Sequence, residues 1–182
     1  MAKTYPVPCT KEEMDALIES AKDDDFFYML LKVMRKTGRR LGEYYDVKVK
    51  DVDFQKKIMM TKVLKRRMRV EKEAILDDDL VFLIKMYIVN HQLTLDDYLF
   101  RKVGYRQIEK RISAYGEKAG IPHRVSPHST RHFFVSELFK KGWTYDKIAK
   151  LTGHSSPGTL VQYDHTVASD IADEAREAIK DL

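Results

Sequence analysis

The chain has 182 residues, 43% of them hydrophobic and 34% charged, and its 33 basic and 28 acidic side chains give a formal net charge of +5. This apolar content is enough for one domain or two small ones, and it excludes a disordered or low-complexity chain. The single cysteine, Cys9, rules out an internal disulfide framework, and because no apolar run is long enough for a membrane span or a secretion signal, we expect a soluble cytoplasmic protein.

Helical periodicity dominates the N-terminal part of the chain. Thr10 and Glu13 have the spacing of a capping box, and the apolar residues after them predict a first helix over 11–22. A second helix, rich in residues typical of a core, is predicted over 25–36, and a short third helix over 41–47.

The pattern changes to extended chain between residues 51 and 70. Apolar residues are spaced for strands there, and a basic tract over 62–69 lies at or near the turn between them. We therefore predict a small antiparallel sheet.

Helical periodicity returns after the sheet and continues to the C-terminus. The predicted helices cover 80–87, 108–119, 128–141, 145–151, 157–163 and 169–182. No internal repeat is present, and no linker rich in glycine, serine or proline divides the chain. The predicted fold class is α+β and mainly helical, with one domain over 1–182 that includes an N-terminal arm (1–9) and a C-terminal tail helix (166–182).

Several short polar motifs follow one another along this predicted fold. Arg40 and Glu43 are three residues apart, a spacing that on its own is typical of an ordinary ion pair on a helix. His128 and Arg131 have the same spacing and therefore lie side by side on one helix face. Neither motif taken alone supports a function.

The order of the motifs is more informative. The chain contains Thr-Gly-Arg-Arg-Leu-Gly-Glu at 37–43, Thr-Lys at 61–62, His-Ser-Thr-Arg at 128–131, Gly-His at 153–154 and a tyrosine at 163. From about residue 8 to 165, this series resembles the tyrosine recombinases, the site-specific DNA integrase and recombinase family. The resemblance implies that family's catalytic-domain fold and metal-independent cleavage and rejoining of double-stranded DNA, with no cofactor and no small-molecule substrate.

The resemblance implies a role for each motif residue. Tyr163 is expected to be the nucleophile that forms a 3′-phosphotyrosyl bond, and Arg40 and Arg131 are expected to clamp the phosphate with planar, permanently charged forks. The family's spacing selects Arg40 over Arg39, so we expect Arg39 to contact solvent or the DNA backbone. Glu43 is expected to be a buried partner that holds the turn.

Three histidines accompany these residues. His128 resembles the family's acid/base histidine, and His154 stands where the family has a donor to a phosphate oxygen. His132 is interpreted as a supporting or core residue, and Gly153 as a backbone turn position. We reject a zinc site at His128 and His132 because the glutamate of a His-Glu-x-x-His motif is missing and Arg131 would place a cation beside the metal. His91 and His123 are expected at the surface, and His165 fits either a pattern of the family or a local hydrogen-bonding residue.

The lysine that would protonate the leaving oxygen is less clearly marked. Lys62 follows a threonine as in the family's hairpin, but the expected glycine in the turn is missing, and Lys65 remains an alternative. Together with Arg66, Arg67 and Arg69, these side chains form a basic cluster that is either a DNA-binding surface or a solvated hairpin. A sequence pI near 9.1 favours a polyanionic partner without deciding the question.

The resemblance also implies a larger assembly. Family members carry an N-terminal domain that embraces the other face of DNA, and nothing before residue 8 supplies it, so we expect weak DNA binding by this chain. The tail over 166–182 has an apolar stripe that docks either on a neighbouring protomer of a homotetramer or on its own domain. Three alternative functions remain: a type IB topoisomerase, a catalytically silent DNA-binding module and a helical interaction domain.

Overall fold

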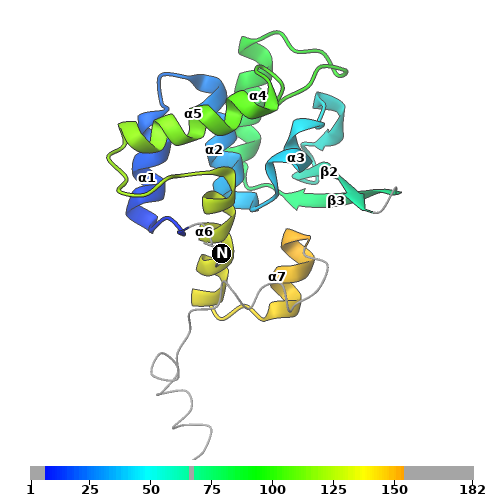
Figure 1. The fold of residues 1–182 in the computed structure, drawn as a ribbon. Helices are drawn as coiled ribbons and strands as arrows, with labels where there is room; N and C mark the ends of the chain where they lie inside the picture. The colour runs from blue at the N-terminus through cyan, green and yellow to red at the C-terminus, as the bar shows by residue number, and fades with distance from the viewer. Residues whose placement is uncertain (1–6, 66–67, 154–182) are drawn as a thin grey trace, which may run out of the picture.

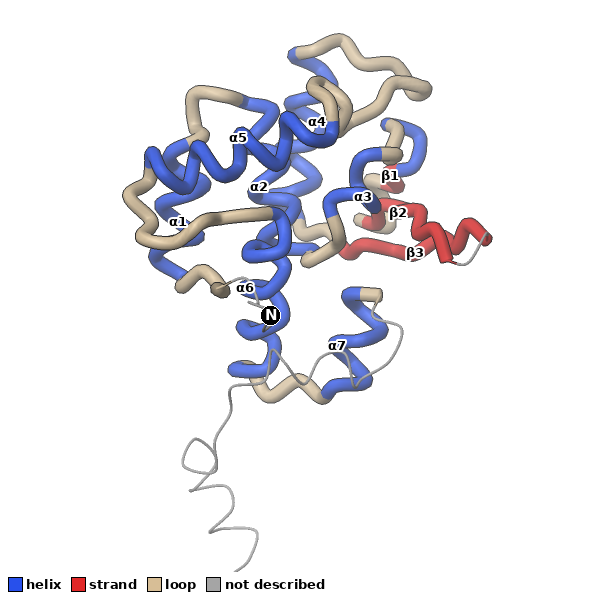
Figure 2. Tube along the Cα trace, viewed as in Figure 1, coloured by secondary structure: helices blue, strands red, loops and turns tan. Residues whose placement is uncertain are grey.

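The protein is mainly helical, and a small sheet projects from one side of the helices (Figures 1 and 2). The computed structural model describes residues 7–65 and 68–153. Within these ranges, the side chains of 63–65 and 68–70 are not described. In chain order, the elements are α1 (Lys11–Ser20), α2 (Asp25–Thr37), α3 (Leu41–Tyr45), η1 (Val49–Asp51), β1 (Val52–Asp53), β2 (Ile58–Lys65), β3 (Met68–Ile75), α4 (Asp78–Asn90), α5 (Tyr105–Lys118), α6 (Pro127–Lys140) and α7 (Tyr145–Thr152).

The predicted helices within the described residues are all present, and their ends differ from prediction by no more than three residues. The capping box at the start of α1 is confirmed, because the Thr10 hydroxyl accepts the Glu13 backbone N–H at 3.1 Å and the Glu13 carboxylate accepts the Thr10 N–H at 2.9 Å. α4 begins earlier than its apolar periodicity predicts because Asp77 caps it, accepting the N–H of Leu80 at 3.0 Å. The helices predicted over 157–163 and 169–182 lie outside the described residues.

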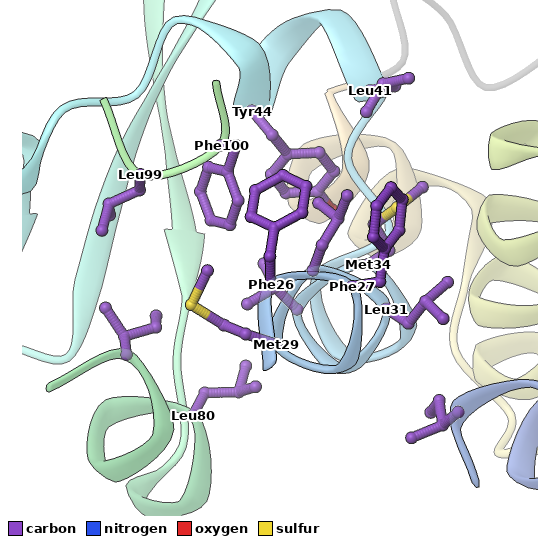
Figure 3. Packing of buried hydrophobic residues seen from close by; sticks show 14 of the residues in the cluster. Phe26, Phe27, Met29, Leu31, Met34, Leu41, Tyr44, Leu80, Leu99 and Phe100 are labelled. Atoms are coloured by element: carbon purple, nitrogen blue, oxygen red, sulfur yellow. The ribbon is translucent and has the colours of Figure 1, made fainter. Parts of the chain in front are cut away.

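α2 is the central helix of the hydrophobic core. It packs against α1, α4 and α6, and most of its residues are buried. Phe26 lies close to the rings of Tyr44 and Phe100, and the last two make an edge-to-face contact with their centroids 5.7 Å apart (Figure 3). A helix buried on several sides is a rigid base for the segment that follows its C-terminus.

The sheet has three antiparallel strands in the order β1-β2-β3, as the extended pattern predicts. In the β2–β3 hairpin, Thr61 pairs with Lys72 and Lys62 pairs with Glu71. Residues opposite each other in an antiparallel pair point to the same face, and neighbours along a strand point to opposite faces. Thr61 and Lys72 are therefore on one face of the hairpin, and Lys62 is on the other.

α7 lies beside the C-terminal half of α6 and contacts β3 (Figure 1). It ends at Gly153, whose φ of +75° is the left-handed conformation that glycine adopts most readily. The turn role predicted for Gly153 is confirmed. Within the described residues, no helix is long and apolar enough to span a membrane.

Candidate functional site

The first part of the site is the segment that joins α2 to α3. α2 ends at Gly38, which has a φ of +58°. The hydroxyl of the buried Tyr44 lies 2.6 Å from the Thr37 hydroxyl and accepts the backbone N–H of Arg39 at 2.9 Å. Burial raises the pKa of the Tyr44 phenol, so it stays protonated and remains a hydrogen-bonding group at neutral pH. These bonds fix the backbone on which Arg39 and Arg40 stand.

Arg40 caps α3 and directs its guanidinium towards solvent. Its side chain is 43% exposed, and Nη1 lies 3.1 Å from Oε1 of Glu43, whose side chain is only 5% exposed. Glu43 is therefore buried, as expected for the partner that holds this turn. Arg40 is oriented by a fixed carboxylate yet remains accessible to an anion from solvent.

Arg131 is the buried guanidinium at the centre of the site. It is 2% exposed, and Nη1 donates to the backbone carbonyls of Gly38 at 2.7 Å and Thr152 at 3.1 Å. These carbonyls stand at the C-termini of α2 and α7, where backbone acceptors are left unpaired and the helix dipole is negative. Arg131 therefore joins α2, α6 and α7 at one point.

His128 lies one helical turn before Arg131, and its side chain is partly buried and partly open to solvent. Partial burial lowers the pKa of its imidazole below 6.5, and the positive charges of Arg131 and Arg40 lower it further, opposed by Glu109. The interaction with both arginines brings Arg40, His128 and Arg131 into one electrostatic cluster. At neutral pH this cluster presents two permanent cations and a neutral imidazole, which together suit an anion whose chemistry needs a base.

Arg39 is not the solvent-facing residue that the sequence predicts. It is 1% exposed and donates through Nη2 to the backbone carbonyl of Glu73 on β3. Its pKa is lowered by burial. The expected contact with solvent or the DNA backbone is wrong, because the segment after Gly38 turns this side chain between β3 and the end of α7.

The face of the hairpin that carries Lys72 and the buried Thr61 is its inner face, and Lys62 is on the opposite, outer face. Its ammonium lies 3.7 Å from the carboxylate of Asp51. Lys72, which belongs to none of the sequence motifs, is on the other face: a Cβ placed on Gly153 would lie 3.2 Å from Nζ of Lys72 and 2.7 Å from Nη1 of Arg39. Lys72 therefore stands beside the turn that ends α7. No local sequence signal identifies Lys72, because the pairing of β2 with β3 decides which lysine shares a face with Thr61.

The remaining predicted residues differ in how far the structure describes them. His132 is 6% exposed, in agreement with a supporting or core position. His154, Tyr163, Arg66 and Arg67 lie outside the described residues, and for Lys65 and Arg69 only the strand backbone is described. The described site therefore unites Arg40, His128 and Arg131 and adds Lys72 and Arg39.

The chain is similar in sequence to site-specific recombinases. A model of the phage integrase family matches residues 9–169. Tyrosine recombinase XerA of Pyrococcus furiosus is 28% identical over 97% of this chain and 63% of its own length. Tyrosine recombinase XerC of Natranaerobius thermophilus is 30% identical over 85% of this chain and 56% of its own length. The chain thus spans less than two thirds of these relatives.

Solved structures share the fold. The crystal structure of XerA recombinase has a TM-score of 0.80 at 29% identity and is covered over 67% of its chain by 98% of this one. XerH recombinase bound to a palindromic difH substrate has a TM-score of 0.76 at 20% identity, covering 98% of this chain and 54% of that one, which is evidence for the fold alone. The predicted catalytic-domain fold is confirmed.

Proposed function

The chain belongs to the phage integrase family, and from this premise we propose that it cuts and rejoins double-stranded DNA through a covalent bond between Tyr163 and a 3′ phosphate. The Tyr163 oxygen attacks phosphorus, the bond to the 5′ oxygen breaks, and the 3′-phosphotyrosyl bond keeps the energy needed for rejoining. Neither water nor a nucleotide cofactor is consumed. The observation that carries this proposal is the cluster of two guanidinium groups and a neutral imidazole around the junction of α2, α6 and α7.

Arg40 and Arg131 are proposed to hold the nonbridging phosphate oxygens as charge accumulates in the transition state. A guanidinium offers paired donors in a planar fork, and fixed donors aimed at developing charge stabilise a transition state without reorganisation. The two arginines are suited to different tasks. Arg131 is anchored by two backbone carbonyls, and Arg40 is open to an incoming backbone phosphate.

His128 is proposed to take the phenolic proton of Tyr163 and to return it on rejoining. A phenol has a pKa of about 10, so only about a thousandth of it is ionised at pH 7, a deficit of about 4 kcal/mol. A neutral imidazole accepts the proton, and nearby cations stabilise the phenolate. The lowered pKa of His128 keeps it in the basic form at neutral pH. His154 is proposed as a donor to a phosphate oxygen.

For the proton that the leaving 5′ oxygen needs, the position of Lys72 adds a candidate to the predicted Lys62. Lys62 lies 3.7 Å from the Asp51 carboxylate on one face of the hairpin, and Lys72 lies beside Gly153 on the other face. We propose that Lys72 contributes positive charge to the scissile phosphate and is a candidate general acid alongside Lys65. Lys65, Arg66, Arg67 and Arg69 are proposed as contacts to the DNA backbone.

We further propose that the active assembly is a homotetramer on paired DNA sites. An apolar groove of about 590 Å³ between α2, α6 and α7 offers a docking surface for the tail over 166–182, and its lining includes Phe133, Trp143 and Leu151. A tail that docks on a neighbouring chain would link the protomers of the tetramer, whereas a tail that docks on its own chain would not. Light scattering on DNA should show a tetramer for the full chain and a smaller species after deletion of 166–182. Equal sizes would contradict docking of the tail on a neighbouring chain.

The catalytic proposal is tested with a suicide substrate nicked beside the scissile phosphate, which traps the covalent intermediate. The wild-type chain should give a protein–DNA band resistant to denaturation, and Tyr163→Phe should give none. Tyr98→Phe, which changes an exposed tyrosine of the described part, is the matched control and should keep the band. A band that persists in Tyr163→Phe would show that the nucleophile is another residue.

The alternatives predict different outcomes with this substrate and with supercoiled plasmid DNA. A topoisomerase would relax supercoiled DNA without giving recombinant product, whereas a recombinase requires two partner sites. A DNA-binding module without catalytic activity would shift the DNA and never form the band. A helical interaction domain would bind no DNA, and neither Arg40→Ala nor Arg131→Ala would change any phosphodiester reaction.

A further inference from the structure

Three side chains that are ligands of metal ions in other proteins converge at the start of α1, away from the proposed active site. They are Cys9, Glu13 and His123, and their sulfur, carboxylate oxygen and imidazole nitrogen all lie within 4.8 Å of one another. Cys9 precedes the cap of α1, Glu13 is in its first turn, and His123 lies in the connection from α5 to α6. Segments more than a hundred residues apart in the chain therefore meet at this cluster.

The cluster is largely shielded from water. Cys9 is 5% exposed, and the side chains of Glu13 and His123 are 21% and 18% exposed. His123 is thus not the surface residue that the sequence predicts. Nε2 of His123 lies 3.2 Å from a Glu13 carboxylate oxygen that also accepts the Thr10 backbone N–H at 2.9 Å. These bonds hold the imidazole and carboxylate in place beside the thiol.

We propose that Cys9, Glu13 and His123 bind one divalent transition-metal ion of the zinc class and that this ion ties α1 to the connection before α6. Thiolate, imidazole and carboxylate are the protein ligands of zinc, whereas calcium and magnesium prefer oxygen ligands alone. Ligand atoms about 2.0–2.3 Å from a tetrahedral ion lie roughly 3.3–3.8 Å from one another. The observed group reaches that spacing through small side-chain movements, and water takes the fourth position.

The thiol chemistry of the site makes binding depend on pH. Metal ions bind the thiolate and not the thiol. Binding therefore forms the metal–sulfur bond and releases the thiol proton to solvent, so the apparent affinity should rise as the pH rises.

The ion would be structural and would take no part in DNA cleavage. α6 begins at Pro127, shortly after His123, and carries His128 and Arg131. Fixing the connection before α6 fixes the start of that helix, but none of the three ligands belongs to the proposed catalytic residues. The site therefore goes beyond the proposed function and can fail without affecting it.

Cobalt titration of the full chain tests the proposal, because Co²⁺ reports its ligands by absorption. The wild-type protein should bind one Co²⁺ per chain with a thiolate-to-cobalt charge-transfer band, and Zn²⁺ should displace it. Cys9→Ser should abolish the band, and Cys9→Ser and His123→Asn should each weaken binding at least tenfold. Zn²⁺ should raise the thermal midpoint of the wild type and not of Cys9→Ser.

His91→Asn is the matched control, because His91 is also a half-buried histidine 2.5 Å from a carboxylate, that of Asp25, but has no thiol nearby. It should keep the wild-type cobalt spectrum. If Cys9→Ser does not fold, as judged by circular dichroism, His123→Asn and Glu13→Gln decide. Absence of the charge-transfer band, or equal affinity in the wild type and the ligand variants, would overturn the proposal. The covalent DNA adduct, measured with and without chelator, reports separately on the proposed function.

Discussion

The pKa of His128 depends on the charged groups around the imidazole as well as on its burial. Its imidazole is partly buried and stands near the guanidinium groups of Arg131 and Arg40, so adding a proton would place a third positive charge in the same cluster. The sequence alone places His128 and Arg131 on one helix face. It does not bring Arg40 to them, because that contact depends on how α2 and α6 pack.

We predict that the lower limb of the pH profile for cleavage falls below pH 6.5, the ordinary pKa of histidine. The neutral imidazole is the base, so cleavage is lost as pH falls through its lowered pKa. Removing a cation that lowers this pKa should raise it again. NMR titration of His128 should therefore show a higher midpoint in Arg40→Gln than in the wild type.

Arg124→Gln is the matched control for this titration. Arg124 is an exposed arginine just before α6 and is not among the groups that shift His128. The midpoint should stay at its wild-type value. An equal shift in both variants would mean that net charge, and not the position of Arg40, sets the pKa.

Gly38 is the residue at which backbone conformation and packing limit substitution together. Its φ is +58°, and an added Cβ would lie 2.1 Å from the ring of Phe134 on α6. We predict that Gly38→Ala lowers the free energy of unfolding by about 2–5 kcal/mol, the sum of left-handed strain and overpacking. Gly120→Ala, with a φ of +72° and no atom within 4 Å, carries the strain alone and should cost about 1–2 kcal/mol. Urea unfolding measures both, and equal losses would exclude the Phe134 contact as a cause.

At the scale of elements, the β2–β3 hairpin shows how the register decides which lysine reaches the site. The sequence predicts strands and a basic turn, and a Thr-Lys pair directs attention to Lys62. The pairing of Thr61 with Lys72 instead directs Lys72 towards Gly153 and Arg39. A shift of one residue in register would exchange the two faces, and no local pattern in a hairpin with basic residues on both strands fixes that choice.

We predict that Lys72→Ala slows cleavage of ordinary DNA at least tenfold and that Lys62→Ala has a smaller effect, because Lys62 is paired with Asp51 on the outer face. A substrate with sulfur in place of the 5′ oxygen distinguishes the possible roles. A thiolate leaves without a proton, since its pKa is about 8.5. That substrate should restore the rate of a variant lacking the general acid and not that of one lacking charge stabilisation.

Lys65→Ala, measured on both substrates, completes the comparison. Rescue of Lys65→Ala by sulfur with no rescue of Lys72→Ala would assign proton transfer to Lys65 and charge stabilisation to Lys72. A Lys72→Ala variant with the wild-type rate on ordinary DNA would exclude Lys72 from the reaction.

For the whole molecule, the sequence predicts which elements exist better than it predicts how they meet. Capping signals and apolar periodicity define α1, α2 and α6 because they act within a few residues. The burial of Arg39 and the carbonyls that anchor Arg131 depend on contacts among α2, β3, α6 and α7. A local pattern also treats every arginine after a helix end alike. The motif spacing distinguishes Arg40 from Arg39 in role, but it does not indicate that Arg39 is buried and Arg40 exposed.

Charge distribution across the molecule bears on DNA binding. The acidic runs near the starts of α2 and α4 are paired within the fold: Asp24 with Arg111, Asp77 with Lys36 and Asp78 with Lys57. These pairs use basic side chains outside the proposed site. Arg40 has a buried carboxylate partner but is itself open to solvent. A net charge of +5 favours association with a polyanion.

We predict that this chain binds duplex DNA weakly and with a steep salt dependence. Of the three arginines around the described site, Arg40 is open to solvent, whereas Arg39 and Arg131 are buried. Binding through phosphate contacts loses affinity with a slope of about −0.9 per contact in a plot of log K against log salt. Fluorescence anisotropy at several salt concentrations measures that slope.

Arg40→Gln should make the slope shallower by about one contact, whereas Arg39→Gln should leave the slope unchanged because Arg39 is buried against β3. Tight binding that is insensitive to salt would contradict the prediction, because affinity would then come from contacts other than phosphates.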